Sequence, residues 1–275
     1  MKTKKVIGIL LICVFTASAA VSGHLFFKQY RDAKNSAETF EDLASLIQDV
    51  EASDPGILVD TESGDTSPLS ETENPIGEEL AVTESELAYE KYRALYEQNS
   101  DFVGWIYIEG TNINYPVMQT PDNPDYYLKH SFEKTYSDYG VPYLDEACEI
   151  GVSNNLVIYG HHMSNGTMFC DLDGYTDKAF CDVHPIIRFD TLSSFGEYEV
   201  IAVFRYNTNH EDFRYDKYVS MDEKVFALFM EQVQKRQIYS TGRSAEYGDQ
   251  LLTLSTCEYT YKNGRLVIVA RKVVQ

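Results

Sequence analysis

The stretch Leu251-Leu252-Thr253-Leu254-Ser255-Thr256-Cys257-Glu258-Tyr259 lies close to the C-terminus and guides the interpretation of the rest of the chain. It has the pattern of an apolar strand that carries one thiol near its end. A polar segment, Tyr261-Lys262-Asn263-Gly264, follows it, and a second apolar strand then opens with Arg265. The pattern predicts a β-hairpin with a thiol beside its turn, where reactive groups are often held.

The width of this turn decides which residues face one another across the hairpin. If residues 258–264 form a wide loop, Cys257 faces Arg265. If Asn263-Gly264 forms a two-residue turn, Cys257 lies opposite Ala270 instead. The sequence allows both registers.

Seven other short segments have the composition of strands, and the last of them is the second strand of the hairpin. Together with the cysteine strand at 250–256, the predicted strands are 103–108, 113–118, 141–144, 156–159, 186–189, 198–206 and 266–274. Turn residues separate them at spacings typical of a β-barrel or a β-sandwich. The sequence therefore predicts a mainly β domain.

Three helices interrupt or precede these strands. Thr83-Glu84-Ser85-Glu86 has the form of a capping box and opens a predicted amphipathic helix that ends near Asn99. A second, longer helix is expected over residues 221–238, directly before the cysteine strand. A short helix is also expected over residues 28–50, where apolar residues recur at helical spacing.

The N-terminus predicts a membrane anchor. Residues 1–5 form a basic tail, and an uncharged run over residues 6–27 is long enough to cross a hydrocarbon core of roughly 30 Å. The position of the basic flank predicts a single-pass protein of the cell membrane whose catalytic domain is extracytoplasmic. A cleaved signal peptide that ends near Ala17-Ser18-Ala19 is the alternative.

An acidic linker over residues 28–82 follows, and residues 32–90 hold −16 of the net charge of −20. Its later part is rich in Asp, Glu, Ser, Thr, Pro and Gly, which bury too little apolar surface to fold alone. We interpret it as a solvated extracytoplasmic linker, with the binding of calcium or of a basic cell-wall partner as the functional alternative. An acidic chain of this kind is also a poor binder of nucleic acid.

The five cysteines are an odd number and are too sparse for a disulfide framework in 275 residues. Cys257 ends a strand beside a turn, whereas Cys148, Cys170 and Cys181 lie in sequence typical of loops. A lone cysteine is often just a small buried apolar residue. Cysteine catalysis also needs a group that carries protons and donors for an oxyanion.

His161 is the candidate proton carrier, because the strand that ends at Gly160 presents it at its tip. The ordinary alternative is a histidine that is solvated at the surface or that makes a structural hydrogen bond. A zinc cluster built from His161, His162, Cys170, Cys181 and His184 is a further alternative, but these spacings match no common ligand pattern.

Arg265 and Arg271 lie on one face of the last strand. A guanidinium can bind a peptide or stabilise an oxyanion, since it is always charged and carries several donors. The register of the hairpin decides which of the two lies nearer to Cys257. Ser255 lies on the same strand face as Cys257 and is a candidate supporting hydroxyl.

Taken together, these residues resemble those of the sortases, the cysteine transpeptidases of Gram-positive cell surfaces. Thr253-Leu254-Ser255-Thr256-Cys257 matches the Thr-Leu-x-Thr-Cys motif of that family, Gly160-His161 matches its histidine, and Arg265 matches its arginine. The resemblance covers roughly residues 85–275. It implies a closed eight-stranded sortase-type β-barrel with an N-terminal helix, and a catalytic domain over residues 83–275.

Several further segments resemble the class B branch of the family. These are Val103-Gly104-Trp105-Ile106, Tyr115-Pro116-Val117, Asp125-Tyr126-Tyr127-Leu128, Tyr159-Gly160-His161-His162-Met163, Gly166-Thr167-Met168-Phe169 and the long helix before the cysteine strand. The resemblance also implies that the loop over 207–220 and the helix after it form a wall of the substrate groove.

The resemblance implies a transpeptidase with His161, Cys257 and Arg265 as catalytic residues, and Ser255 and Thr256 as support for the substrate or the oxyanion. Such an enzyme cleaves a C-terminal sorting motif after Thr and joins the secreted surface protein to a peptidoglycan amine, without a metal or other cofactor. Two alternatives share this chemistry: a pilin-polymerising sortase and a secreted cysteine peptidase. A catalytically inactive wall-binding module is a third.

Overall fold

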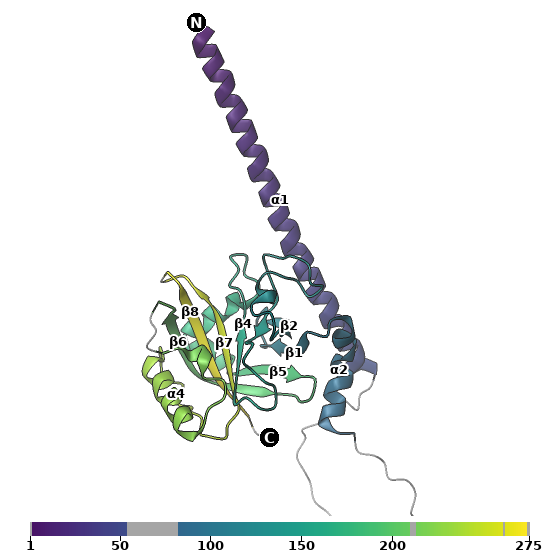
Figure 1. Cartoon of the computed structure of the whole chain (residues 1–275), viewed down its shortest axis with the longest axis vertical. Helices are drawn as coiled ribbons and strands as arrows, with labels where there is room; N and C mark the ends of the chain where they lie inside the picture. Colours follow the sequence, from purple (N-terminus) through teal and green to yellow (C-terminus); the bar gives the residue numbers. More distant parts are fainter. Residues whose placement is uncertain (1, 54–81, 210–212, 261, 274–275) are drawn as a thin grey trace, which may run out of the picture.

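The computed structural model describes residues 2–53, 82–209, 213–260 and 262–273. Eight strands close into a barrel in the order β1-β2-β3-β4-β7-β8-β6-β5 (Figure 1). They are β1 (Phe102–Tyr107), β2 (Asn114–Met118), β3 (Tyr143–Leu144), β4 (Asn155–Tyr159), β5 (Ile186–Thr191), β6 (Glu197–Asn207), β7 (Leu251–Glu258) and β8 (Gly264–Lys272). The prediction of a closed eight-stranded barrel is therefore confirmed.

The cysteine strand β7 lies between two partners of opposite direction. It pairs in parallel with β4 and antiparallel with β8. Its residues Leu251, Leu252 and Leu254 are fully buried. A strand that is covered on both faces has a nearly continuous apolar sequence rather than a strict alternation, and this explains the run that opens β7.

Helices α2 and α4 occur where the sequence predicts them. Helix α2 (Glu84–Gln98) begins at Thr83, whose side chain accepts from the backbone of Glu86 while the Glu86 carboxylate accepts from the backbone of Thr83. This capping box satisfies donors that the first turn of a helix leaves free. Helix α4 (Glu223–Arg236) begins at Asp222, which caps the backbone of Val225.

Four short helical segments were not expected. They are the 3₁₀ helices η2 (Tyr126–Leu128), η3 (Phe169–Thr176) and η4 (Tyr215–Lys217), and helix α3 (Lys178–Val183). Segments of one or two turns are too short to show a periodic apolar pattern, so the sequence gives no signal for them. Two of them, η2 and η4, contribute residues to the cleft described below.

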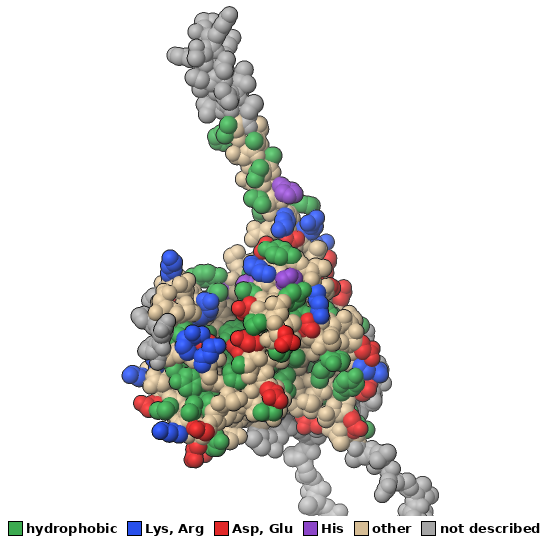
Figure 2. All heavy atoms as spheres, viewed as in Figure 1, with side chains coloured by type: hydrophobic (Ala, Val, Ile, Leu, Met, Phe, Trp, Pro, Cys, Tyr) green, Lys and Arg blue, Asp and Glu red, His purple; other side chains and the backbone are tan. Residues whose placement is uncertain are grey.

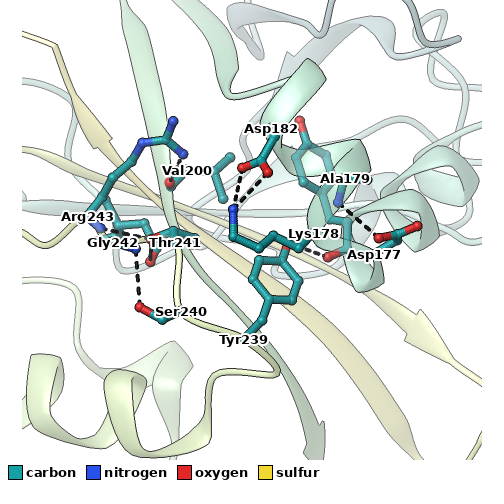
Figure 3. A network of polar contacts seen from close by, with 12 residues as sticks. Asp177, Lys178, Ala179, Asp182, Val200, Tyr239, Ser240, Thr241, Gly242 and Arg243 are labelled. Carbon is teal, nitrogen blue, oxygen red and sulfur yellow. Dashed lines mark hydrogen bonds and ion pairs between the residues drawn. The ribbon is translucent and has the colours of Figure 1, made fainter.

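Polar contacts attach the long connection between α4 and β7 to the body of the barrel (Figure 3). The Thr241 hydroxyl donates to the Ile201 carbonyl of β6 at 2.7 Å, and Arg243 Nη1 lies 3.5 Å from the Val200 carbonyl. The Tyr239 hydroxyl donates to the Tyr175 carbonyl at 2.7 Å. These hydrogen bonds fix the course of the segment that leads from α4 to the start of β7.

Helix α1 (Lys2–Ser53) includes the helix that was predicted over residues 28–50, and its N-terminal part projects away from the barrel (Figure 1). Close to the barrel, Phe40, Leu43 and Ile47 are buried and belong to the same apolar core as the strands. The boundary at residue 83 stays a prediction, but this part of α1 packs as an element of the folded domain.

The predicted membrane anchor is not supported by the structure. The projecting part of α1 carries exposed apolar side chains such as Phe15, Leu25 and Phe26 (Figure 2). Within the described residues, however, no helix combines the length and the apolar character that a membrane crossing requires. Thr, Ser, Gly and His interrupt the apolar residues, and charged residues follow from Lys28. The predictions of an anchor over 6–27 and of a single-pass membrane location are therefore wrong.

The later part of the acidic linker, residues 54–81, lies outside the described residues, and so does the side chain of Cys13. The predictions of a solvated stalk or a calcium site in that segment therefore fall outside what the structure describes. The four described cysteines, Cys148, Cys170, Cys181 and Cys257, are all free thiols.

The close approach of β1 and β5 at Gly104 predicts that a side chain at this position would destabilise the barrel. A Cβ added at Gly104 would lie 2.2 Å from the Asp190 carbonyl oxygen of β5, whereas one added at Gly23 of α1 would meet nothing within 4 Å. We expect Gly104→Ala to reduce the free energy of unfolding by about 1–3 kcal/mol or more. Gly23→Ala should cause no loss, since alanine is the better helix former. Urea unfolding of both variants checks this, and equal midpoints would contradict it.

Candidate active site

The registers of β7 with its two neighbours bring the three predicted catalytic residues together. In the parallel pair of β4 and β7, Tyr159 faces Ser255, so continuing the pairing by two residues aligns His161 with Cys257. In the antiparallel pair of β7 and β8, Cys257 faces Arg265. Side chains that share a register position on adjacent strands lie on the same face of the sheet. We therefore describe His161, in the loop directly after β4, together with Cys257 of β7 and Arg265 of β8 as one row, and all three line the same cleft.

This row lies in a cleft of about 590 Å³. The cleft is lined by strand ends of the barrel and by the loops that follow them. Its lining residues are Asp125, Leu128, Tyr143, Asp145, Glu146, Tyr159, Gly160, His161, Tyr206, Thr208, Arg214, Tyr215, Asp216, Lys217, Ser255, Thr256, Cys257 and Arg265. All five predicted site residues are among them.

Of the described cysteines, only Cys257 lines this cleft, and it is half-buried. Cys148 is buried elsewhere, where its sulfur accepts from the Val157 amide at 3.3 Å, and burial raises the pKa of its thiol to about 12. Cys181 is 1% exposed. A nucleophile must reach its substrate as a thiolate, so Cys257 is the described thiol that suits this role.

His161 follows β4 and is oriented by a backbone carbonyl. Its Nε2 lies 2.7 Å from the Leu128 carbonyl oxygen, so Nε2 carries the proton and donates, and Nδ1 is left to exchange protons. Burial lowers the pKa of His161, and the charges of Lys129 and Arg265 lower it further, against an opposing effect of the Leu128 hydrogen bond. The imidazole is therefore mainly neutral near pH 7.

The two predicted hydroxyl groups make different contacts. The Thr256 hydroxyl donates to the Gly160 carbonyl at 2.8 Å, and the Gly160 amide donates to the Ser255 carbonyl at 3.1 Å. These bonds continue the pairing of β4 and β7 up to His161. The Ser255 hydroxyl lies 2.7 Å from the Tyr215 hydroxyl, and both groups are buried.

Of the two hairpin registers that the sequence allows, the structure has the one with the wide loop. Glu258 pairs with Gly264 and Cys257 with Arg265, while Asn263 takes a left-handed conformation with φ 64°. Arg271 lies at the other end of β8, opposite Leu251, and pairs with Glu199 at 3.5 Å. Arg265, rather than Arg271, is thus the guanidinium beside the thiol.

The cleft also contains groups that the sequence did not reveal. Arg214 makes two hydrogen bonds to Asp216, at 3.0 and 2.6 Å. Burial acts to raise the pKa of Asp216, but these bonds outweigh it and hold the pKa below its ordinary value. Tyr159 donates to Asp145 at 2.7 Å. Arg214 and Asp216 lie at the start of the short helix η4, and Tyr159 and Asp145 come from different segments, so neither pair has a recognisable sequence pattern.

Part of the segment that was expected to form the groove wall lies at this cleft. Thr208, Arg214, Tyr215, Asp216 and Lys217 of the 207–220 loop line the cleft, whereas α4 contributes none of the lining residues that the structure describes. Helix α4 instead packs its apolar stripe into the core and supports the wall from behind.

The residues of the alternative zinc cluster are dispersed. The Cys170 sulfur lies 3.7 Å from His162 Nε2, which also binds Asp173 at 2.7 Å. His184 Nδ1 is instead 2.8 Å from the Glu109 carbonyl oxygen. In the part of the chain that the structure describes, no group of three His, Cys, Asp or Glu residues is arranged to hold a metal ion.

Comparison with known proteins agrees with this geometry. A family model for the sortase domain matches residues 106–273. Sortase B of Listeria monocytogenes is 33% identical over 189 residues, which are 68% of this chain and 75% of that protein. Sortase B of Staphylococcus aureus is 32% identical over 187 residues, which are 66% of this chain and 74% of that protein.

Solved structures give the same result. The Staphylococcus aureus sortase B-substrate complex matches with a TM-score of 0.62 and 29% identity, over 67% of this chain and 85% of that chain. Sortase B of Clostridium perfringens matches with a TM-score of 0.62 and 28% identity, over 66% of this chain and 99% of that chain.

A closed barrel with a thiol, an imidazole and a guanidinium in one row of a cleft, together with these relatives, defines a cysteine transpeptidase. The chain belongs to the sortase family, and the relatives that it matches are of class B.

The environment of His161 predicts its titration. Because burial and the charge of Arg265 lower its pKa, we expect its NMR titration midpoint to lie below the ordinary value of 6.5. The folded state then favours the neutral ring, so this contribution to stability is complete above pH 6.5 and is lost as the pH falls through the folded pKa. Arg265→Gln should raise the midpoint, since it removes a repelling charge. An unchanged midpoint in that variant would contradict the assignment.

The bond between Thr256 and Gly160 predicts a difference between two substitutions. Thr256→Val keeps the shape of the side chain but leaves the Gly160 carbonyl without this donor, so we expect about 1 kcal/mol lower stability and a clear loss of activity. Thr256→Ser keeps the donor and should behave nearly as the original protein. Chemical unfolding and peptide-cleavage rates measure both effects, and equal behaviour of Val and Ser would show that the hydroxyl is unimportant.

Proposed function

We propose that this transpeptidase cleaves a C-terminal sorting motif after Thr and joins the released surface protein to a peptidoglycan amine. The observation that carries the proposal is the row of His161, Cys257 and Arg265 in one cleft. The similar Staphylococcus aureus structure is a sortase B-substrate complex, and this likeness supports substrate binding by the same barrel in this chain.

In the first half of the reaction, the Cys257 sulfur attacks the carbonyl carbon of the Thr residue. Neutral His161 accepts the thiol proton, the new C–S bond forms, and a tetrahedral oxyanion results. As the peptide C–N bond breaks, His161 gives the proton to the leaving amine. The products are a thioester on Cys257 and the free C-terminal peptide.

In the second half, an amine takes the position of the leaving peptide. The amine nitrogen attacks the thioester carbonyl carbon while His161 accepts a proton from the amine. The C–S bond then breaks, and His161 returns the proton to the sulfur. The surface protein is then joined through a new amide bond, and the enzyme is restored. No oxidant or reductant is consumed.

Arg265 is the group we assign to the oxyanion or to substrate positioning. Its place opposite Cys257 puts a permanent positive charge where negative charge develops on the carbonyl oxygen. Its Nη1 donates to the Gly264 carbonyl at 2.9 Å, which fixes one side of the guanidinium. Ser255 and Thr256 support the site through Tyr215 and Gly160, as described above.

Replacement of the nucleophile tests the assignment. We expect Cys257→Ala to lower the cleavage of a fluorogenic sorting-motif peptide by at least about 10⁴-fold, because no thioester can form. Cys170→Ala is the matched control, since Cys170 lies outside the cleft lining, and it should keep its activity. Mass spectrometry of the enzyme with substrate should detect the acyl group on Cys257. Retained activity in Cys257→Ala would refute the role.

Dependence on the amine separates transpeptidation from hydrolysis. Products are identified by mass spectrometry after incubation with the motif peptide and either a peptidoglycan-stem amine or a Lys-containing pilin peptide. Ligation to the stem amine supports wall anchoring, and ligation to the pilin Lys alone supports a pilin polymerase. Hydrolysis that no amine diverts would indicate a peptidase and contradict the proposal.

A further inference from the structure

Behind His161 lies a buried residue in a strained conformation. Met168 has φ 60° and ψ −132°, a combination that side chains other than glycine rarely adopt, and it is 1% exposed. Such a conformation persists only where the surrounding structure enforces it, and strained residues concentrate at functional sites. The contacts that hold Met168 therefore indicate what the strain achieves.

Met168 belongs to a small hairpin that begins at His161. His162 and Met168 form an antiparallel bridge, and the hairpin turns through Gly166, whose amide donates to the Met163 carbonyl at 3.0 Å. The next residue, Phe169, donates its amide to the His161 carbonyl at 2.8 Å. The backbone of His161 is thus fixed by the residue that directly follows the strained one.

The Phe169 ring also fixes the chain on the other side of His161. Phe169 is fully buried, and a Cβ added at Gly160 would lie 2.6 Å from its ring. The ring therefore packs directly against the Gly160 backbone. Rotation of the Met168 turn would move both the hydrogen bond at His161 and this contact at Gly160.

The turn itself is held by one side chain from β2. The Met168 amide donates to the Tyr115 hydroxyl at 3.1 Å. Tyr115 is 6% exposed, and burial raises the pKa of its phenol to about 12, so the hydroxyl stays protonated over the working pH range.

Tyr115 is in turn packed against α1. The Phe40 ring lies edge-on to the Tyr115 ring, with 5.0 Å between the centroids and 65° between the planes. Both rings are buried in the same core. A continuous series of contacts therefore joins Phe40, Tyr115, Met168 and Phe169 to the backbone of His161.

We propose that Tyr115 is a positioning residue for His161, which acts through the Met168 turn and the Phe169 ring, and that Phe40 of α1 holds Tyr115 in place. The inference rests on the proposed function of His161 as the proton carrier. It extends the functional unit beyond the barrel, because a helix that precedes the predicted catalytic domain then contributes to the geometry of the site.

The main test is Tyr115→Phe in the full chain, which removes the acceptor for the Met168 amide and keeps the ring. We expect kcat to fall between about 10-fold and 10²-fold, as a misplaced catalytic group would cause, with little change in KM. The NMR titration midpoint of His161 should rise toward its ordinary value, because a loosened Phe169 turn admits water to the ring. The charged groups that act on His161, namely Lys129, Asp138 and Arg265, are unchanged.

Tyr92→Phe is the matched control. It also removes a hydroxyl bond of a buried tyrosine, the one at 2.6 Å to the Asp190 carboxylate, but this bond joins α2 to β5 and involves no residue of the path to His161. It should leave kcat and the His161 titration unchanged. If Tyr115→Phe and Tyr92→Phe behave alike in both measurements, the proposal is overturned.

Phe40→Leu tests the outer end of the series. We expect the same changes as in Tyr115→Phe, but smaller, and little further effect when the two substitutions are combined, because both act on one contact path. Effects that add in full would show that Phe40 acts independently of Tyr115, which overturns that part. The NMR titration reports on the surroundings of His161 whether or not His161 transfers protons in the reaction. A failure of the proposed function, seen as full activity in His161→Ala, is therefore distinguishable from a failure of this inference.

Discussion

The pairing register of β7 is the constraint on which the site depends. This strand fixes Cys257 relative to β8 by antiparallel pairing and relative to His161 by parallel pairing with β4. A slip of one residue in either ladder would turn the thiol to the opposite face of the sheet. The bond from Thr256 to the Gly160 carbonyl opposes such a slip, and so does close packing, because Leu252 and Leu254 would have to exchange places with the residues of the other covered face. The geometry of the candidate site and the packing of the core are thus set by the same contacts.

Burial around the histidine links the fold to the chemistry. The cleft withdraws His161 from water and places it near the positive charges of Lys129 and Arg265, so the folded protein favours the neutral ring that can accept a proton. The Leu128 carbonyl selects which nitrogen carries the proton, and the Phe169 turn fixes the backbone. These three influences come from η2, β8 and the hairpin after β4. The environment of the proposed proton carrier is therefore defined by parts of the chain that are distant in sequence.

Helix α1 has a different place in the protein from the one that its composition suggests. Its apolar N-terminal residues predict a membrane anchor, yet no described helix meets the requirements of a span. Its later residues, in a segment expected to be a linker, pack Phe40, Leu43 and Ile47 into the core of the barrel. Local hydropathy measures the cost of exposing a side chain, but it does not say which apolar surface covers it. Only the packed structure identifies Tyr115 as the partner of Phe40.

The sequence alone indicated the eight strands, the helix that opens at Thr83, the helix over 221–238, and Cys257, His161 and Arg265 as candidate site residues, because periodicity, capping residues and short motifs are local signals. It left the hairpin register open, since Asn263-Gly264 is compatible with both a tight turn and a wide loop. The tertiary structure decided that register, placed Arg265 rather than Arg271 beside the thiol, and brought Tyr215 to Ser255 and Leu128 to His161. These contacts join residues far apart in the chain, and their energies depend on burial and orientation that exist only once the barrel has closed.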